Sequence, residues 1–542
     1  MALSRRDLLR YTTYGALGLG VTGSLTGPAR SLGIAAAAPK FGVPLPIPDV
    51  LTGSDITLRA AETDVPILPG APTTMWTFNG TFPGPTIRRP SGEPTRVTVV
   101  HDLPVEAKSL TIHHHGSHSA SEHDGLPGRH VIQAGTERTY VYRHTEGGEP
   151  ERAATQWYHD HSHHRTSFNS WMGLGGLFIL DDDVDGALPL PRGRYDIPLF
   201  LTDRTFDGDN QLDLSLFELP PSEREVGGDT HLVNGSHKPY AEVEPRRYRL
   251  RFHNGSGFRL YNLVLTVGDD ILPVTQIGTE SGLLPTSAPR EKVLLGPAER
   301  ADVVVDFTRL EGRRVLLDSV PRDNTTQGDP AALPMGLLEF RVGNRARRTG
   351  PGAPPKRLRP LPDWAADVSP VPARSWVFGH GVDLATGRRA HTINGRPFDH
   401  HRVDARVELG SVETWLLVNT TMQSHTVHIH DVDWLVLRRN GAPPAAHEAG
   451  LKETFRLDPG DHLLVAAKFT DHVGPYMGHC HMLDHEDGGM MATWEVVECR
   501  VELTGARIDR GPRWVVRSGW CAAAHSRAWR CASRPGPRCP AR

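Results

Sequence analysis

The chain has 542 residues, with 60 Lys and Arg against 63 Asp and Glu and a formal net charge of −3. This length exceeds one compact core and predicts two to four domains of roughly 100–200 residues, while the balanced charge argues against a dedicated nucleic-acid binder. The 55 Gly and 45 Pro follow no strict repeat, which excludes collagen and long-helix folds and favours short strands joined by turns.

The N-terminal segment has the composition of an export signal. SRRDLLR at 4–10 precedes a weakly apolar, Gly-rich stretch and an Ala run at 35–38. This order predicts a twin-arginine signal peptide over 1–38, and an extracellular, periplasmic or cell-surface location. A membrane anchor is the alternative, but Gly, Thr, Ser and Pro28 interrupt the stretch, and no later segment is apolar enough to span a membrane. Because the twin-arginine route carries folded proteins, this signal favours a chain that acquires a metal or redox cofactor before export.

The central part of the chain alternates apolar and polar residues with a period of two. Examples are RVTVV at 96–100, ADVVVDF at 301–307 and ETWLLV at 413–418, without any long helical pattern, so the sequence predicts an all-β fold. Linker composition occurs at 181–194 and over a Pro/Arg-rich segment, 344–372. The predicted β-sandwich or Greek-key barrel domains lie at 50–182, 195–343 and 373–503.

The cysteines leave little room for a disulfide framework. They are Cys480, Cys499, Cys521, Cys531 and Cys539. The last three belong to an Arg-, Trp- and Cys-rich tail at 504–542 that has no apolar periodicity. This tail is expected to be disordered or an artefact of the reading frame, and no function is assigned to it.

Histidine is unusually frequent, with 29 residues, and neutral imidazole is the commonest metal ligand in proteins. Random placement would give about 1.5 His-x-His pairs, whereas the chain has five. Residues two apart on a strand project from the same face, within reach of one metal cluster. Four of the pairs fall in the first and third blocks: His113/His115, His159/His161, His428/His430 and His479/His481.

Strand alternation separates these histidines into two sites. In HTVHIH (425–430) the first histidine faces away from the other two, and in HCH (479–481) Cys480 faces away from both neighbours. A second site, back to back with the histidine cluster, would therefore collect His425, Cys480 and His485, with Met490 nearby in the sequence. Two imidazoles, a thiolate and a thioether are the ligands of a blue-copper centre. Zinc is the alternative, but a structural zinc site would more often have paired cysteines.

Four segments resemble, in order and spacing, the copper motifs of multicopper oxidases. They are HHHG (113–116), WYHDH (157–161), HTVHIH (425–430) and HCHMLDHEDGGMM (479–491). NGTFPGPTIR (79–88) and PAERADVVVDF (297–307) look like first- and second-domain segments of the branch containing spore-coat laccase, bilirubin oxidase and phenoxazinone synthase. The resemblance implies an all-β fold of three cupredoxin-like Greek-key β-barrel domains, with a trinuclear copper cluster between the first and third.

The resemblance also implies four copper ions per chain and their ligands. The type 1 copper would take His425, Cys480 and His485, with Met490 axial. The type 2 copper would take His113 and His428. The type 3 pair would take His115, His159, His161, His430, His479 and His481.

The activity implied is that of a laccase-type oxidase, with dioxygen and a small aromatic reducing substrate as partners. Phenols, aminophenols or aromatic amines would give single electrons to the type 1 copper, and four electrons would reduce dioxygen to water through the Cys480 peptide link. Asp124 and Glu486 match acids that the family uses to deliver protons. The alternatives are that Asp124 only shapes a turn and that Glu486 is a solvated charge.

The remaining histidines carry no ligand signal. His114, His118, His123, His163 and His164 flank ligands and are expected to form hydrogen bonds or face solvent, and His400, His401, His462 and His472 have no informative spacing.

Two departures from the family bear on the substrate. Thr426 stands where Pro is usual, which changes local stiffness rather than ligation. Gln423 stands where bilirubin oxidases tend to have Trp, which argues against a dedicated bilirubin oxidase. With no Met-rich run, copper detoxification is also less favoured.

The alternatives kept open are a cuprous or manganese metallo-oxidase of the same fold, and a non-catalytic cupredoxin-type electron-transfer or structural protein. Loops around 371–402 and 440–450 are expected to set donor choice; the spacing sets neither the donor nor the oligomeric state.

Overall fold

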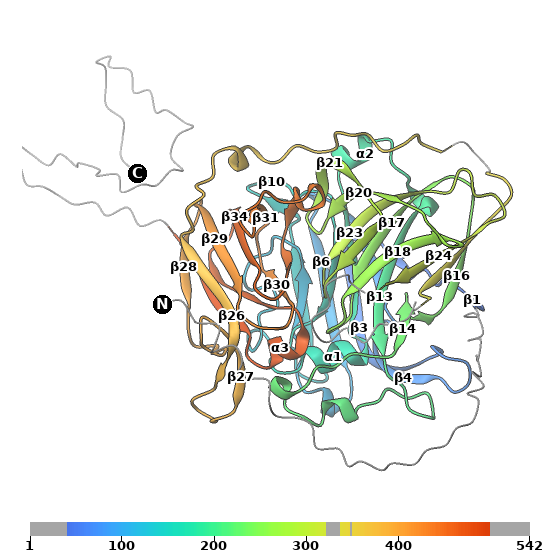
Figure 1. Ribbon diagram of the computed structural model, residues 1–542. Coiled ribbons are helices and arrows are strands. Elements are labelled where there is room, and N and C mark those ends of the chain that lie inside the picture. Colours follow the sequence, from blue (N-terminus) through green and yellow to red (C-terminus); the bar gives the residue numbers. More distant parts are fainter. Residues whose placement is uncertain (1–40, 321–335, 347–349, 499–542) are drawn as a thin grey trace, which may run out of the picture. The chain divides into compact units, whose positions relative to one another are not determined.

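A computed structural model describes residues 41–320, 336–346 and 350–498 (Figure 1). The predicted signal peptide, the 504–542 tail, and all cysteines except Cys480 lie outside the described residues. The structure is mostly β-sheet and 8% helical, so the all-β prediction is confirmed. No described helix is long and apolar enough to cross a membrane. The α-helices of the described part are α1 (Thr166–Met172), α2 (Asp183–Ala187) and α3 (Leu483–Asp487).

Two sheets form the first block, and strands distant in sequence lie side by side within each. One sheet has the order β2 (Val50–Leu51), β5 (Gly84–Pro90), β12 (Gly175–Asp181), β11 (Thr155–Asp160) and β7 (Ile112–His115). The other has the order β4 (Thr73–Phe78), β3 (Asp55–Val65), β6 (Thr95–Asp102) and β8 (Glu137–Tyr142), and β9 (Thr145–Glu146) pairs with β10 (Glu149–Pro150). The short helix η1 covers Val105–Ala107.

The second block also consists of two sheets. The first has the order β1 (Val43–Pro44), β16 (Pro239–Val243), β25 (Leu338–Val342), β24 (Arg314–Ser319), β18 (Tyr261–Val267) and β19 (Asp270–Ile271), with β22 (Lys292–Leu295) also paired to β18. The second has the order β15 (Ser236–His237), β14 (Thr230–Val233), β13 (Asp196–Arg204), β17 (Arg247–Asn254), β23 (Arg300–Asp306), β20 (Val274–Thr279) and β21 (Gly282–Arg290). Short helices are η2 (Gly193–Tyr195), η3 (Ser215–Phe217) and η4 (Pro221–Glu223).

The third block repeats this two-sheet arrangement. One sheet has the order β27 (Arg389–Ile393), β26 (Arg374–Val382), β29 (Val412–Asn419), β34 (His462–Lys468), β31 (Trp434–Arg439) and β32 (Leu451–Lys452). The other has the order β28 (Ala405–Glu408), β36 (Met491–Val497), β35 (Gly474–Cys480), β30 (His425–Ile429) and β33 (Thr454–Leu457). Short helices are η5 (Asp363–Ala366) and η6 (Ala446–Glu448).

Alternating strand residues build a separate apolar core in each block. The three largest clusters are centred on residues 56–180, 197–342 and 376–496. The first core also takes Leu212, Val226 and Leu232 from the second block, so the blocks are packed together and not simply strung along the chain. The division into three domains stays a prediction from the sequence.

The predicted linker at 181–194 contains a helix. Helix α2 begins there because the Asp182 side chain accepts a hydrogen bond from the Asp185 amide, a typical helix cap.

Buried ion pairs fix the first block against the second. Arg251 pairs with Asp196 at 2.7 Å and with Asp302 at 3.2 Å, and Arg88 on β5 reaches Asp196 at 3.3 Å. Thr155 on β11 donates a hydrogen bond to Asp302 at 2.8 Å. These contacts hold the histidine-bearing strand β11 on the second-block sheet.

Candidate metal centre

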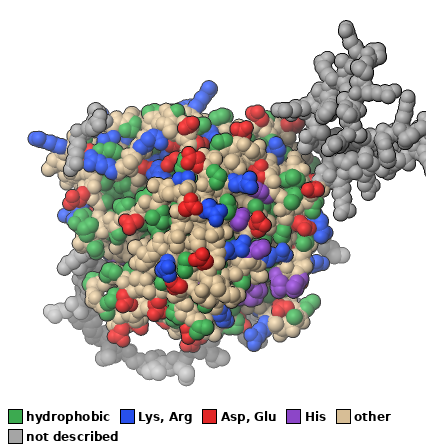
Figure 2. All heavy atoms as spheres, turned by 180° about the vertical axis from the view of Figure 1, so that it is seen from behind, with side chains coloured by type: hydrophobic (Ala, Val, Ile, Leu, Met, Phe, Trp, Pro, Cys, Tyr) green, Lys and Arg blue, Asp and Glu red, His purple; other side chains and the backbone are tan. Residues whose placement is uncertain are grey.

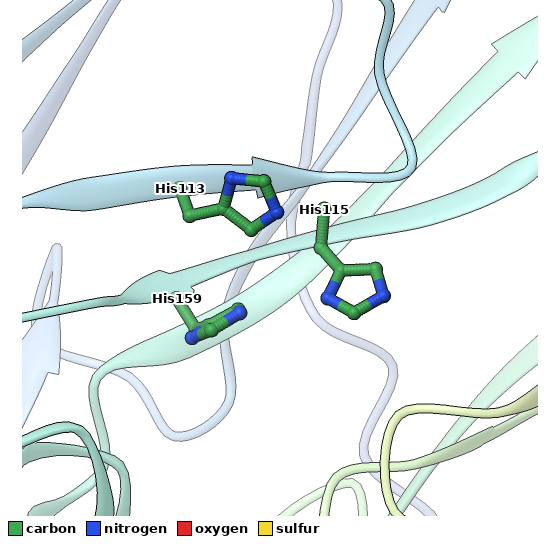
Figure 3. Close-up of side chains that lie close together, drawn as sticks. All are labelled: His113, His115 and His159. Atoms are coloured by element: carbon green, nitrogen blue, oxygen red, sulfur yellow. The ribbon is translucent and has the colours of Figure 1, made fainter. Parts of the chain in front are cut away.

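The first-block histidines lie on neighbouring antiparallel strands (Figure 3). His113 and His115 occupy β7, and His159 on β11 stands directly opposite His113 in the register. A Cβ at Gly125 would lie 2.3 Å from the Ile112 carbonyl oxygen, and Gly125 has a φ of 81°. Glycine therefore lets the loop that carries Asp124 approach β7 closely.

The third-block histidines lie on β30 and β35, directly after them, or on α3, and His428 pairs with His479 in the antiparallel register. His428 and His430 meet the first-block histidines, and His425 lies with Cys480 instead. All of these side chains are buried. The structure thus brings the residues of the four sequence motifs into two groups.

His113 and His428 present lone pairs to each other. The Nδ1–H of His113 donates to the Asp124 carbonyl at 2.6 Å, and that of His428 donates to the Glu453 carbonyl at 3.0 Å. A carbonyl oxygen can only accept, so both Nε2 atoms are unprotonated in the neutral rings. These Nε2 atoms are 3.2 Å apart. A cation between them would relieve the repulsion of the two lone pairs.

His161, His430 and His479 form a second converging set. The Nε2 of His479 lies 3.3 Å from that of His161 and 3.2 Å from that of His430. Each Nδ1 faces a carboxylate: His430 donates to Asp124 at 2.7 Å, and the Nδ1 atoms of His479 and His161 lie 3.0 and 3.4 Å from Glu486 oxygens. Carboxylates that hold Nδ1–H in this way orient imidazoles for metal binding through Nε2.

His115, His159 and His481 complete the cluster. Their ring centroids lie 5.0 to 5.8 Å apart. His115 Nδ1, His159 Nε2 and both nitrogens of His481 are buried without a hydrogen-bond partner among the described residues. Buried polar atoms without partners are costly, so these nitrogens fit a site whose ligand is a metal ion.

For six imidazoles of this cluster, burial and repulsion from neighbouring cations favour the neutral form, which is the form that binds metal. Burial, followed by neighbouring histidines, lowers the pKa of His161 to about 4. The same causes lower the pKa well below the usual value for His113, His115, His159, His430 and His481.

The sulfur-containing site is compact. Cys480 Sγ lies 3.5 Å from His425 Nδ1 and 3.7 Å from His485 Nδ1, and the two nitrogens are 3.1 Å apart. Met490 is held beside them, because its amide donates to the His485 carbonyl and its carbonyl accepts from the Cys480 amide. Burial raises the pKa of the Cys480 thiol to about 12, so a bound cation would be needed to hold the thiolate. One cysteine with two histidines fits copper better than structural zinc.

Both predicted acids lie inside the histidine cluster. Glu486 is 1% exposed and contacts two imidazoles, so the alternative of a solvated charge is wrong. Asp124 has a backbone carbonyl that accepts from His113 and a side chain that accepts from His430, so it does more than shape a turn. Burial and then Asp431 raise the pKa of Asp124 well above its usual value, whereas the contacts of Glu486 with His161 and His479 outweigh burial and lower its pKa.

Glu453 is a cluster residue that sequence reasoning missed. Its Oε2 lies 3.0 Å from His115 Nε2 and 2.9 Å from His428 Nδ1, and its Oε1 pairs with the buried Arg300 of the second block. Burial opposes its charge, but Arg300 and His428 outweigh burial and lower the pKa of Glu453 to about 2. No spacing links Glu453 to a histidine motif; the pairing of Thr454 with His428 places it there.

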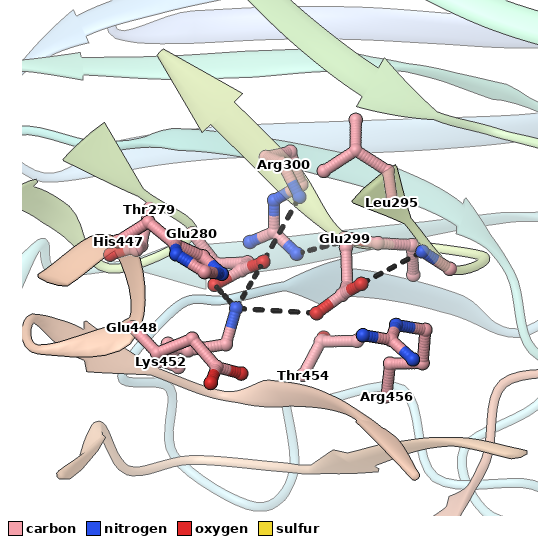
Figure 4. A network of polar contacts seen from close by, with 12 residues as sticks. Thr279, Glu280, Leu295, Glu299, Arg300, His447, Glu448, Lys452, Thr454 and Arg456 are labelled. Atoms are coloured by element: carbon pink, nitrogen blue, oxygen red, sulfur yellow. Dashed lines mark hydrogen bonds and ion pairs between the residues drawn. The ribbon is translucent and has the colours of Figure 1, made fainter. Parts of the chain in front are cut away.

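A buried lysine next to Glu453 joins the third block to the second (Figure 4). Lys452 Nζ lies 2.8 Å from Glu280 and 3.3 Å from Glu299. Both acids come from the second block, which therefore holds the strand segment that carries Glu453.

His391 and His380 were also missed, because neither belongs to a His-x-His motif. The His391 ring stacks on His485 with centroids 4.3 Å apart, and the His380 ring lies 5.0 Å from His391. His485 and His391 are buried, whereas His380 is exposed. A row of imidazoles thus leads from the sulfur site to the surface.

Two of the histidines that were expected to form hydrogen bonds or face solvent are buried in the structure. His114 packs against Phe178 and Tyr142 at ring-centroid distances of 4.0 and 4.6 Å. His118 is buried near Asp433, 3.9 Å away.

Family models, related sequences and a solved structure all match this chain to multicopper oxidases. Two family models, both described as multicopper oxidase, match residues 59–185 and 367–499. A laccase of Bacillus subtilis is 31% identical over 85% of this chain and 99% of its own length. A bilirubin oxidase of Albifimbria verrucaria is 32% identical over 84% of this chain and 81% of its own length. The crystal structure of a multi-copper oxidase from Pediococcus acidilactici matches with a TM-score of 0.73 and 31% identity, covering 85% of this chain and 93% of that one.

Proposed function

The chain belongs to the multicopper oxidase family, with its all-β fold of cupredoxin-like domains, and we propose that it is a laccase-type enzyme. It would couple the one-electron oxidation of phenols, aminophenols or aromatic amines to the reduction of dioxygen to water. The observation that carries the proposal is the donor set: ten of the eleven histidines of the four motifs, and Cys480, converge as two buried groups.

The donor set fits four copper ions. His425, Cys480 and His485, with Met490 beside them, would hold a type 1 copper. His113 and His428 would hold a type 2 copper through their facing Nε2 atoms. The type 3 pair would be held by His115, His159, His161, His430, His479 and His481.

When bound, the copper ions supply one-electron acceptance from the donor and four-electron reduction of dioxygen. The chain contributes a short covalent link between the two groups, because Cys480 lies between His479 and His481 in the sequence. It also excludes water from both groups, since all three residues are buried.

Asp124 and Glu486 are proposed to hold and deliver protons. Burial favours the neutral form of Asp124, which can then give a proton, while the carboxylate of Glu486 lies 3.4 Å from His161 Nδ1 and 3.0 Å from His479 Nδ1 and can accept a proton. Their carboxylates orient His430, His161 and His479 at the same time.

The electron donor is proposed to dock at the exposed His380, behind which the buried His391 stacks on His485. His485 is fully buried, so an aromatic donor cannot touch it in this structure. The rings of His391 and His380 cover that side, and His380 provides contact with an aromatic ring.

The same pair of imidazoles supports one alternative. Because imidazole binds copper, His380 and His391 could also receive a cuprous ion, which would make the chain a metallo-oxidase.

Export by the twin-arginine route is part of the proposal and rests on SRRDLLR at 4–10. It predicts that the copper-loaded chain leaves the cytoplasm folded.

Oxygen uptake by copper-loaded protein tests the proposed laccase-type activity and its metallo-oxidase alternative. Uptake with 2,6-dimethoxyphenol, and its loss in Cys480→Ser, would support the laccase-type activity. Uptake with cuprous ions but with no phenol or aromatic amine would favour the metallo-oxidase. No uptake with any donor by a fully loaded sample would contradict an oxidase.

A further inference from the structure

Histidine side chains gather in a patch on one face of the described part of the molecule (Figure 2). Two pairs of adjacent histidines in particular come from segments more than 230 residues apart in the sequence and meet at the surface. His163 is half-buried, whereas His164, His400 and His401 are exposed. None of these four belongs to the copper groups described above.

The four rings lie close to one another. The centroids of His163 and His164 are 3.8 Å apart, those of His400 and His401 are 3.9 Å apart, and His163 lies 5.8 Å from His400. Exposed side chains of this length can rotate so that several nitrogens reach one ion at a bond distance of about 2.0–2.1 Å.

Hydrogen bonds to the backbone hold the two histidine pairs next to each other. His164 Nδ1–H donates to the Asp487 carbonyl at 2.7 Å, and the Phe398 amide donates to the Gly489 carbonyl at 2.9 Å. Both segments are therefore anchored at the C-terminal end of α3, one to its last residue and the other just after it. Phe398 also packs edge-on against the His163 ring, at 5.4 Å.

The hydrogen bond of His164 fixes its tautomer. Because Nδ1 carries the proton, Nε2 has its lone pair available for a metal ion. A carboxylate lies beside the second pair, since Asp399 accepts a hydrogen bond from the His401 amide at 2.9 Å. Imidazole donors with a nearby carboxylate suit borderline divalent ions, and Cu²⁺ is the strongest binder among them.

We propose a surface site for one divalent transition-metal ion, formed by His163, His164, His400 and His401. The site is separate from the buried copper groups, and it does not depend on the oxidase activity.

Ni²⁺ binding to the copper-loaded, full-length protein tests the site, after a chelating resin has removed any copper ion held at the surface. Ni²⁺ can then be counted apart from the resident copper. We expect one Ni²⁺ per chain by calorimetry and elemental analysis. The double variant His400→Ala/His401→Ala should bind Ni²⁺ at least about tenfold more weakly, because it loses half of the ligands. His164→Asn should also bind Ni²⁺ more weakly, because it removes the imidazole Nε2. The variant should keep its local structure, because Asn tolerates the left-handed backbone at this position (φ 57°) and can keep the bond to Asp487.

The exposed His462, at the start of β34, provides the matched control. His462→Ala should bind Ni²⁺ as the unmodified chain does, and unchanged blue absorption would show that every variant is folded and loaded. The proposal is wrong if the unmodified chain binds no stoichiometric Ni²⁺. It is also wrong if either the double variant or His164→Asn binds as tightly as the control, since a site formed by both segments must be weakened by each.

Discussion

At single residues, the hydrogen bond on one ring nitrogen decides what the other nitrogen can bind. His113 and His428 use Nδ1–H to reach backbone carbonyls, and His430 uses it to reach Asp124. In each case Nε2 is left as an acceptor that faces the Nε2 of another imidazole. Carboxylates and carbonyls around the cluster therefore determine its chemistry as much as the histidines do.

Asp124→Asn tests the proton role of this carboxylate. Asn can still accept the hydrogen bond from His430 but cannot give up a proton. Oxygen consumption should fall by roughly a hundredfold, a typical contribution of a positioned acid. Under nitrogen, the donor should reduce the blue site at the normal rate, which is measured by stopped-flow as the loss of its blue absorption.

Asp270→Asn, on the exposed strand β19, is the control and should change neither rate. Normal oxygen consumption by Asp124→Asn would remove Asp124 from proton delivery.

Glu453→Gln tests the carboxylate that the sequence did not indicate. Loss of its charge should weaken the orientation of His428 and His115, and outer-shell changes of this kind cost about 10–100-fold in metal affinity. Dialysis against a chelator should then remove one copper ion per chain without loss of the blue absorption. Glu448→Gln, which alters the ion pair with Arg439, should retain all copper; equal retention by both variants would contradict the role of Glu453.

Most histidines of the two groups could be predicted because they sit in short motifs on or next to strands, where alternation assigns each side chain to a face. Glu453 and His391 could not be predicted, because each reaches its site through pairing between distant strands or through ring stacking.

At the scale of secondary-structure elements, the segment from β32 to β33 connects the second block to the cluster. Lys452 is anchored by Glu280 and Glu299, and the next residue, Glu453, is anchored by Arg300. Both anchors are buried, so water cannot replace a lost partner.

Lys452→Met should therefore destabilise the fold by roughly 3–5 kcal/mol, because it leaves two buried carboxylates unpaired. Chemical denaturation monitored by circular dichroism measures this change. Lys468→Met, on the half-buried end of β34, should stay within about 0.5 kcal/mol of the unmodified chain. A triple variant that also replaces Glu280 and Glu299 by Gln should recover part of the loss; equal stability of Lys452→Met and Lys468→Met would show that the lysine does not anchor this segment.

The strands of the all-β fold could be predicted from period-two alternation, but helix α2 within 181–194 could not. A short helix with a capping aspartate has too few residues to show periodicity.

At the scale of the whole molecule, the blocks are joined by buried charges whose pairing depends on pH. Burial opposes the charge of Asp196, but Arg251 and Arg249 outweigh burial and lower the pKa of Asp196 below its usual value. A carboxyl group with a lowered pKa stabilises the fold above its unfolded pKa of about 3.9, and this contribution is lost as the pH falls toward the folded pKa.

Asp196→Asn should cost roughly 3–5 kcal/mol at neutral pH, because it leaves a buried guanidinium without its main partner. The difference in melting temperature between the two proteins should shrink below about pH 4, when the unmodified chain begins to lose the same interaction. Asp209→Asn, at an exposed turn, should match the unmodified chain at every pH. A difference for Asp196→Asn that stays constant into acid would contradict the pKa argument.

Copper content per chain tests the central claim most directly. Protein folded with copper and then passed over a chelating resin, which removes any surface ion, should retain about four copper ions and show a blue absorption that is lost in Cys480→Ser. A content of about one copper ion, or zinc in place of copper, would contradict the assignment of the ten histidines and Cys480 to a type 1 site and a trinuclear cluster.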